Sequence, residues 1–181
     1  EALAQGTAKI TEISNSGSVP ELQFFNDGDI PVLLLDGEEL VGAKQNRVLN
    51  LSILAPAHDA IKIPVSCVEQ GRWSYRSGEF RSEDRVHYSR GRSAKAASVS
   101  MSMESRGSRR SDQSEVWRNI SGKSGRLGVS SPTESMSDIY EHRKRTIEGT
   151  VKALTSRDLQ VGAIFGIDDA VAGVDLFDAP N

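Results

Sequence analysis

Short apolar runs separated by turn residues fill the first third of the chain and predict strands rather than helices. Residues 8–13 and 22–25 are rich in β-branched and aromatic side chains, and they predict two flanking strands. After Pro31, the run from Val32 to Leu35 is apolar without alternation, which is typical of a strand covered on both faces. We expect this run to form the central strand of the fold.

The next segment predicts a meander of hairpins. Asp36 and Gly37 both tolerate positive φ, so they predict a type I′ turn that reverses the chain after the central strand. The expected strands of this meander cover residues 38–43, 47–54 and 60–68, with a second reversal at 44–46. In the last strand, Ile61, Ile63 and Cys67 fall on one face because side chains alternate along a strand.

The middle of the chain is the part that its pattern defines least. Residues 74–97 hold few apolar anchors among scattered Arg and Ser, and we expect mostly loop and sheet edge there. Val99, Met101 and Met103 then alternate with serine, which predicts a strand over residues 98–103 with these three side chains in the core.

Two helices are expected after residue 110. The first begins at Ser111 and Asp112, whose side chains can accept hydrogen bonds from the first turn, and it ends by Gly122. The second begins with Ser131 as N-cap, because Pro and Glu follow at the positions that favour a helix start, and it continues to about Ser156.

A further hairpin closes the chain, with strands over 161–167 and 171–177 around a turn at Asp168 to Ala170. The elements together predict a single α+β domain over residues 1–181, built on a mainly antiparallel β-sheet with two packed helices.

Composition narrows the class of protein. Only 37% of the residues are hydrophobic, and no run approaches the roughly 18 to 20 apolar residues of a membrane-spanning helix. The start of the chain has no basic and then apolar leader. A single cysteine excludes an internal disulfide framework. We therefore expect a cytoplasmic protein without a membrane partner, and we leave a homo-oligomer open.

Charge is distributed unevenly along the chain. Residues 1–71 carry ten acids and four bases, residues 72–126 carry six acids and thirteen bases, and residues 127–181 carry nine acids and five bases. The basic middle could bind nucleic acid or an acidic protein. It could also pair with acidic side chains of the same fold, which we favour.

Familiar catalytic and cofactor motifs are missing. Gly122-Lys123-Ser124 resembles the end of a phosphate-binding loop, but Trp117 stands where that loop needs glycine. His58, His87 and His142 have no second ligand at metal-binding spacing. We expect no cofactor and no metal, although Glu38, Glu39 and Glu69 could converge in space.

Cys67 allows two interpretations. A nucleophilic thiolate needs a lowered pKa from nearby cations or a helix N-terminus. The alternation of its strand instead places Cys67 on the apolar face, as a buried core residue.

Two polar runs are the main candidates for a ligand site. Lys44-Gln45-Asn46-Arg47 sets two amides between two cations, a combination that suits phosphate, carboxylate or ribose. Glu69-Gln70-Gly71-Arg72-Trp73 adds an aromatic face on which a ring could stack. Both runs could equally be polar turns that cap their own backbone.

The segments VLLLDGEELVGAKQNRVLN, IPVSCVEQGRW, DQSEVW and GVDLFDAP resemble a family whose own activity is not established, the ADP-ribosylglycohydrolase/rhodanese-phosphatase-associated protein domain. The resemblance is specific from Pro31 to Trp73 and loose over residues 74–110. Family members continue past the LFD stretch into a further helical segment, so the resemblance implies that the C-terminus is incomplete. It also implies a context of NAD and ADP-ribose metabolism. The motif residues present here are Glu38, Glu39, Lys44, Gln45, Asn46, Arg47, Asn50, Cys67, Glu69, Gln70, Arg72 and Trp73.

Two hypotheses of function remain. In the first, the domain binds or processes a phosphorylated, nucleotide-like molecule derived from NAD or ADP-ribose. Lys44 and Arg47 would hold phosphate, Asn46 and Asn50 the ribose, and Trp73 the ring.

If this first hypothesis includes catalysis, Glu39 or Glu69 would act as acid or base. In the second hypothesis, a non-enzymatic module uses its basic middle to bind an acidic protein or nucleic acid, of which we favour the protein. Whether the chain is an enzyme stays open, and an enzyme that uses Cys67 is a third alternative.

Overall fold

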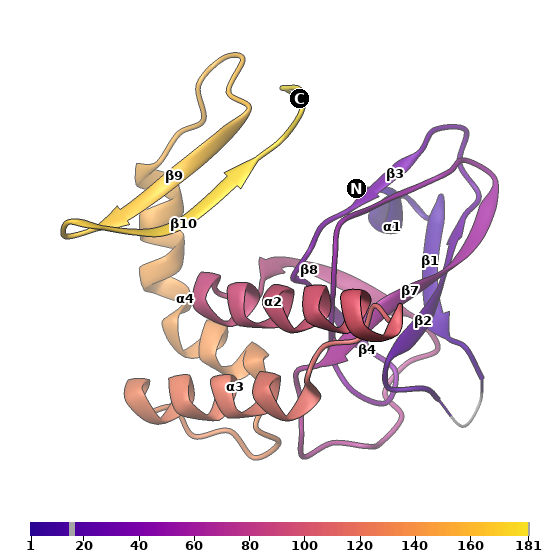
Figure 1. The fold of residues 1–181 in the computed structure, drawn as a ribbon, viewed down its shortest axis with the longest axis horizontal. Coiled ribbons are helices and arrows are strands. Elements are labelled where there is room, and N and C mark those ends of the chain that lie inside the picture. The colour runs from indigo at the N-terminus through magenta and orange to yellow at the C-terminus, as the bar shows by residue number, and fades with distance from the viewer. Residues whose placement is uncertain (15–16, 181) are drawn as a thin grey trace.

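A closed six-stranded barrel forms the body of the protein in the computed structural model, which describes residues 1–14 and 17–180 (Figure 1). Every pairing in it is antiparallel, in the order β1-β2-β7-β5-β4-β8. The barrel strands are β1 (Ala8–Glu12), β2 (Glu21–Asn26), β4 (Glu38–Gly42), β5 (Arg47–Leu49), β7 (Asp59–Cys67) and β8 (Phe80–Val86). The predicted α+β class with a mainly antiparallel sheet is confirmed, and closure into a barrel is more specific than the predicted meander.

Alternation along the strands fills the barrel interior. One cluster of buried side chains includes Ile10, Phe24, Leu40, Leu49 and Ile63, which come from five different strands. A second cluster lies outside the barrel, where Val48, Val68, Val116, Ile120, Met136 and Ile139 pack together. The outward face of the β5 region is therefore covered by helices.

The prediction of a central strand after Pro31 is wrong. Residues Val32–Leu34 form β3, which pairs only with β6 (Ile53–Ala55) in a separate two-stranded sheet. Leu33 is 50% exposed and Leu54 is 65% exposed, so only one side of this ribbon faces the core. Expected strand 47–54 is correspondingly divided between β5 and β6.

The turn at Asp36 and Gly37 exists, but it does not join paired strands. Glu38 N–H donates to the Leu35 carbonyl (3.1 Å), and of the two central residues only Gly37 has positive φ (79°). This geometry is not type I′, which needs positive φ at both positions. Strand β4 instead pairs with β5 across the predicted reversal at 44–46, and with β8.

Four helices occur in the described residues: α1 (Ala2–Gln5), α2 (Ser89–Arg106), α3 (Gln113–Leu127) and α4 (Met136–Ala153). The predicted strand at 98–103 lies inside α2 and is wrong, and the predicted loop at 74–97 contains β8 and the start of α2. Met101 and Met103 are 69% and 46% exposed, so only Val99 of the predicted core trio is buried.

The predicted helix starts are close to the observed ones. Asp112 is the N-cap of α3, and its carboxylate accepts from the Ser114 and Glu115 N–H groups. The helix α4 begins four residues later than predicted, because Ser135 rather than Ser131 is its N-cap. Ser131 accepts a hydrogen bond from the Ser135 N–H (2.8 Å), so it organises the turn that precedes the helix.

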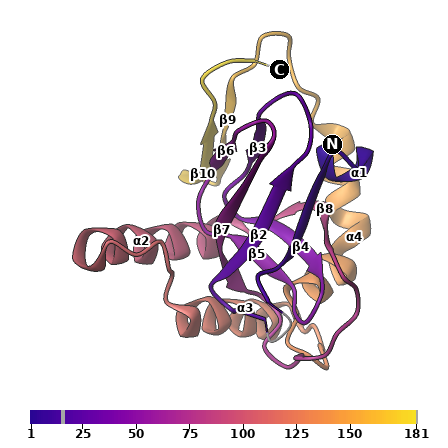
Figure 2. The same cartoon turned by 90° about the vertical axis from the view of Figure 1, so that its right-hand side faces the viewer.

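The closing hairpin is confirmed as β9 (Gly162–Ile167) and β10 (Ala170–Leu176), a two-stranded sheet separate from the barrel. Both views show it projecting beyond the end of α4, with α2 and α3 running side by side next to the barrel (Figures 1 and 2). None of the helices in the described part of the chain has the length and apolar character that crossing a membrane requires.

Candidate functional site at one end of the barrel

The two polar runs meet at one end of the barrel. Residues 44–46 form the turn between β4 and β5, and residues 69–73 follow β7, which is the neighbour of β5. Gln45 Nε2 donates to the Glu69 carbonyl (3.0 Å), and Asn46 N–H donates to Glu69 Oε2 (3.1 Å). The runs therefore form one polar cluster.

Glu69 and Arg72 are the centre of this cluster, and both are buried. Arg72 Nη2 lies 2.7 Å from Glu69 Oε2 and donates to Asn46 Oδ1 (3.1 Å), while Thr133 Oγ1 donates to Glu69 Oε1 (3.0 Å). Burial raises the pKa of Glu69, but the bonds from Arg72, the Asn46 backbone and Thr133 outweigh burial and hold that pKa below its ordinary value. Glu69 is therefore a fixed anion and a poor proton carrier.

Glu39 has the opposite electrostatic character. It is fully buried, and burial raises its pKa to about 7 against the lowering influence of Ser137 and Arg85. Ser137 Oγ donates to Oε1 (2.8 Å). Arg85 Nε lies 2.8 Å from Oε2, yet neither of these two atoms has a hydrogen-bond partner among the described residues, so Arg85 opposes burial through its charge. Glu39 can exchange a proton near neutral pH.

Glu39 and Arg47 lie on opposite faces of the β4–β5 hairpin. Glu39 is paired with Val48, and Leu40 with Arg47. Leu40 belongs to the barrel interior, whereas Val48 packs in the outer cluster under α3 and α4. Since directly opposed residues share a face, Arg47 points into the barrel and Glu39 out of it. A ligand held by Arg47 would not contact Glu39.

Arg47 is the most unusual side chain of the cluster. It is 0% exposed, and its Nη1 donates to Gln45 Oε1 (3.2 Å) and to the Asn46 carbonyl (3.4 Å). Among the described residues, its Nε and Nη2 have no hydrogen-bond partner. Burial lowers the pKa of Arg47, but a guanidinium stays charged in proteins. The barrel therefore contains a cation with one unpaired donor edge.

Glu12, Lys44 and Trp73 lie together beside Arg47. A Cβ built on Gly17 would lie 3.3 Å from Lys44 Cδ, 3.4 Å from Glu12 Oε2 and 3.5 Å from Trp73 Cη2, so the three side chains meet at one place. Lys44 Nζ lies 5.4 Å and Arg47 Cζ 5.9 Å from the Trp73 ring centroid, within cation–π range. Both carboxylate oxygens of Glu12 are buried without a hydrogen-bond partner among the described residues.

Cys67 is fully buried beside Arg47. Burial raises the pKa of its thiol, which outweighs the lowering influence of the Arg47 charge. The Sγ atom lies 3.4 Å from the Glu69 carbonyl, to which it donates. These features favour the interpretation of Cys67 as a buried structural thiol over a nucleophile.

Two predicted ligand residues lie apart from Arg47. Asn50 Nδ2 donates to the Arg109 carbonyl (3.0 Å), and its Oδ1 accepts from Ser66 Oγ, so both ends of its amide serve the packing of the segment before α3. Gln70 is exposed. The structure thus joins Lys44, Gln45, Asn46, Arg47, Glu69, Arg72 and Trp73, and it places Asn50 and Gln70 elsewhere. Glu39 is linked to this cluster through Ser137, whose hydroxyl donates to Glu39 Oε1 (2.8 Å) and accepts from Asn46 Nδ2 (3.0 Å).

The basic middle of the chain pairs extensively with acids of the same chain. Ion pairs link Arg72 to Glu69, Arg81 to Glu83, Arg85 to Glu39, Arg92 to Asp175, and Lys95 to Asp36. These contacts support the intramolecular interpretation of the excess positive charge.

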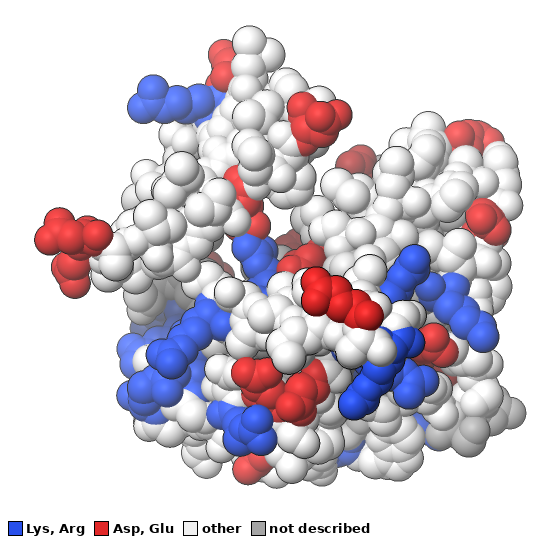
Figure 3. Space-filling view, in the orientation of Figure 1, with Lys and Arg blue, Asp and Glu red and all other residues white. Residues whose placement is uncertain are grey.

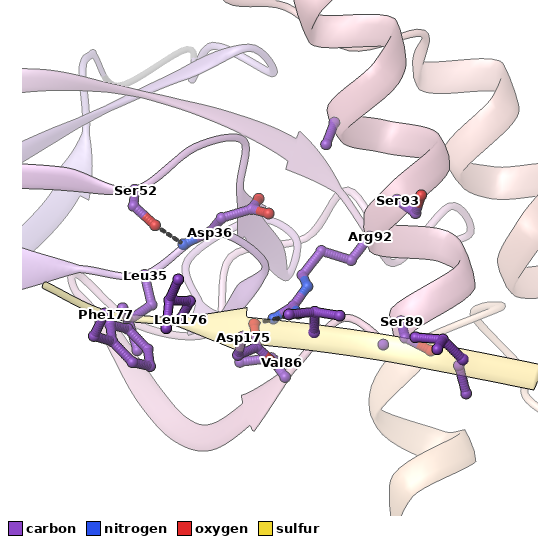
Figure 4. Close-up of a pocket in the computed structure, with 15 residues that line it drawn as sticks. Leu35, Asp36, Ser52, Val86, Ser89, Arg92, Ser93, Asp175, Leu176 and Phe177 are labelled. Atoms are coloured by element: carbon purple, nitrogen blue, oxygen red, sulfur yellow. Dashed lines mark hydrogen bonds and ion pairs between the residues drawn. The ribbon is translucent and has the colours of Figure 1, made fainter. Parts of the chain in front are cut away.

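A groove of about 650 Å³ lies away from the polar cluster, between β8, α2 and β10. Figure 4 shows Arg92 reaching across it to Asp175, and Ser52 accepting from the backbone of Asp36. None of the predicted ligand residues lines this groove.

Sequence reasoning missed Glu12 and the partners of Glu39. The inward alternation of Ala8 and Ile10 continues to Glu12, which was the available signal for an acid inside the barrel. Arg85 and Ser137 carried no such signal, because their segments were predicted as loop and as helix interior. Among the described residues, no group of three or more His, Cys, Asp or Glu side chains could hold a metal ion.

Comparison with known proteins identifies a family and no activity. The family model of the ARG and Rhodanese-Phosphatase-superfamily-associated Protein domain (ARPP-1) matches residues 1–181. Neither the curated proteins nor the solved structures gave a match. Because the family model covers residues 1–181, the chain belongs to the ARPP-1 domain family.

Proposed function

We propose that this domain is a cytoplasmic module that binds a phosphorylated, ring-bearing small molecule of the ADP-ribose or NAD type at the end of its barrel. The observation that carries the proposal is the fully buried Arg47, whose Nε and Nη2 lack a partner among the described residues. The resemblance to a family associated with ADP-ribosylglycohydrolase supports this context.

The unpaired edge of Arg47 suits a phosphate oxyanion. Nε and Nη2 lie on one edge of the planar guanidinium, and this edge donates two parallel hydrogen bonds to a phosphate or carboxylate. Each buried donor without a partner costs about 1–3 kcal/mol, so a ligand that satisfies both recovers that free energy. Lys44 lies close enough to add a second positive charge at the same end of the barrel.

The remaining groups suit the rest of such a molecule. The Trp73 indole is 51% exposed and offers a surface on which a base can stack. The carboxylate of Glu12, which has no hydrogen-bond partner among the described residues, can accept hydrogen bonds from ribose hydroxyls. Asn46, predicted for the ribose, has its amide engaged by Arg72 and Ser137, so we assign the ribose to Glu12 instead.

The proposal concerns binding rather than catalysis. Glu69 is fixed as an anion by Arg72, and Glu39 faces out of the barrel, so neither predicted acid or base is placed beside Arg47 as a proton carrier. Cys67 has a raised pKa.

Isothermal titration calorimetry with ADP-ribose and with NAD tests the proposal. Arg47→Met removes the donor edge while it keeps an unbranched apolar stem, and Trp73→Ala removes the stacking surface at a half-exposed position that the core does not need. Arg76→Met is the matched control, because Arg76 is exposed and lies three residues beyond Trp73.

We expect the wild type and Arg76→Met to bind alike, and Arg47→Met and Trp73→Ala each to weaken binding by at least about tenfold. An absence of heat for both ligands with the wild type would refute the proposal. Equal affinity of Trp73→Ala and wild type would remove Trp73 from the site, and equal affinity of Arg47→Met would refute the assignment of the phosphate.

A further inference from the structure

The C-terminal arm, residues 143–180, carries an unusual amount of exposed apolar surface. It contains the second half of α4 and the β9–β10 hairpin. Twelve large apolar side chains in it are between 37% and 82% exposed: Ile147, Val151, Leu154, Leu159, Val161, Ile164, Phe165, Ile167, Val171, Val174, Leu176 and Phe177. Exposed apolar surface on this scale marks an interaction site where the side chains share a face.

The hairpin has one face that α2 partly covers and one open face. On the covered face, Gly173 lies against Ser89 of α2, and Asp175 pairs with Arg92. The strand register places Ile164, Val171, Val174 and Leu176 together on the other face, where each is at least 54% exposed. Figure 3 shows the hairpin as a largely uncharged lobe with acidic side chains at its tip.

The second half of α4 also exposes apolar side chains. Ile147, Val151 and Leu154 follow one another at helical spacing, and all three are exposed. Among the described residues, β9 pairs only with β10, so its outer edge has unpaired backbone groups. An isolated two-stranded sheet is marginally stable in water, whereas four strands with a buried face are stable.

Charge complementarity within the arm indicates what covers it. The hairpin turn carries Asp168 and Asp169, and α4 carries Arg143, Lys144 and Arg145, all of them exposed. The positive charges therefore lie at the start of the arm, and the negative charges lie at the tip of its hairpin. In a two-fold contact, the acidic tip of one copy meets the basic run of the other, and the apolar faces meet each other.

The exposed apolar area is consistent with such an interface. At roughly 100 Å² of apolar side chain per residue, the seven side chains of the open hairpin face and the α4 stripe, exposed by about 60% on average, offer on the order of 400 Å² per copy. A stable interface buries about 800 Å² per partner, of which somewhat more than half is apolar.

We propose that the C-terminal arm is the interface through which two copies of this chain form a two-fold dimer. The open hairpin face and the exposed stripe of α4 are buried, and the charged ends pair between copies. The dimer is independent of the proposed ligand at the barrel end, because none of the residues named for that ligand belongs to the arm.

Sedimentation velocity over micromolar to near-millimolar concentration tests the dimer. The double variant Ile164→Glu/Val174→Glu places charge on the open hairpin face. Leu54→Glu is the matched control, since Leu54 is a 65% exposed apolar residue of β6, outside the arm. We expect the wild type and Leu54→Glu to be dimers and the double variant to be a folded monomer by circular dichroism.

Charge reversal tests the pairing without changing the apolar surface. We expect Asp168→Lys/Asp169→Lys and Arg143→Glu/Arg145→Glu each to weaken the dimer by at least about tenfold at low salt, and the combination of all four to restore it. A monomeric wild type throughout the concentration range overturns the proposal. A dimer unaffected by Ile164→Glu/Val174→Glu, or an open-ended series of larger species, also overturns it.

Discussion

Replacing Glu39 by Gln should change the pH dependence of folding in a defined direction. Glu39 is fully buried, and burial raises its pKa from 4.5 to about 7. Gln retains an oxygen that accepts the Ser137 hydroxyl, and it has nearly the same shape, but it does not titrate. The substitution therefore removes the ionisation and leaves the packing.

The sign and size follow from proton linkage. Between pH 4.5 and about 7, the folded wild type keeps a proton on Glu39 that the unfolded chain has released. The free energy of unfolding of the wild type therefore falls as pH rises through this window, and it changes no further above it. The pKa difference corresponds to about 3 kcal/mol. The stability of Glu39→Gln relative to wild type should rise by that amount across the window.

Urea unfolding followed by tryptophan fluorescence, at pH values from below 4.5 to above 7, measures this difference. Glu141→Gln is the matched control, because Glu141 pairs with the same Arg85 but its side chain is 57% exposed. We expect the control to differ from wild type by less than about 1 kcal/mol at every pH. A Glu39→Gln difference that is flat with pH, or that falls as pH rises, would show that the Arg85 charge outweighs burial and would refute the reasoning.

Two further substitutions test the packing at the same end of the barrel by urea unfolding. Arg72→Met leaves Glu69 as a buried anion without its ion-pair partner and should lower the free energy of unfolding by about 3–5 kcal/mol. The double variant Arg72→Met/Glu69→Gln should lose less, and equal losses in the two variants would contradict the pairing. Gly42→Ala should lower the free energy of unfolding by about 2 kcal/mol or more, because Gly42 has φ of 146° and a Cβ there would lie 2.5 Å from the Glu79 carbonyl oxygen. Unchanged stability would contradict that geometry.

The sequence predicted an element well where its apolar residues recur with the period of a strand or where turn residues mark its ends. The bounds of β1, β7 and the closing hairpin lie within a few residues of the predicted ones. Alternating side chains indicated the strands, and the turn residues indicated the hairpin. The helix α2 was not predicted, because it has almost no apolar face. Its buried residues are Gly91, Lys95 and Val99, and a helix that packs through a glycine and a lysine shows no hydrophobic stripe.

Two errors have related physical causes. The run after Pro31 was read as a doubly covered strand because it is uniformly apolar, yet Leu33 and Leu54 stay exposed on the β3–β6 ribbon. Apolar content alone does not reveal which faces a short ribbon covers. Met101 and Met103 alternate with serine by coincidence inside α2. Met101 lies on the exposed side of the helix, and Met103, four residues after buried Val99, is still 46% exposed near the helix end.

The sequence predicted most residues of the candidate site, but it did not predict which side of the sheet each side chain lies on. Strand β5 pairs with β4 and with β7, which brings residues 44–47 beside residues 69–73, and the predicted meander already placed these strands on one sheet. The separation of Glu39 from Arg47 depends on the β4–β5 register, since a shift of one residue would reverse both side chains. Glu12 enters the site from β1, far away in sequence, and only barrel closure brings it near Arg47.

The buried polar atoms on the two faces of the β4–β5 hairpin differ in what opposes their burial, and this difference argues for a ligand on one face. On the outer face, Glu39 Oε2 and Arg85 Nε lack a hydrogen-bond partner among the described residues, but they lie 2.8 Å apart as an ion pair. On the inner face, Arg47 Nε and Nη2 and both carboxylate oxygens of Glu12 have no hydrogen-bond partner among the described residues, and no ion pair of the described structure includes them. A phosphate would supply the missing partners of Arg47, whereas the outer pair already has its opposite charge, so the inner face is the better candidate for a ligand.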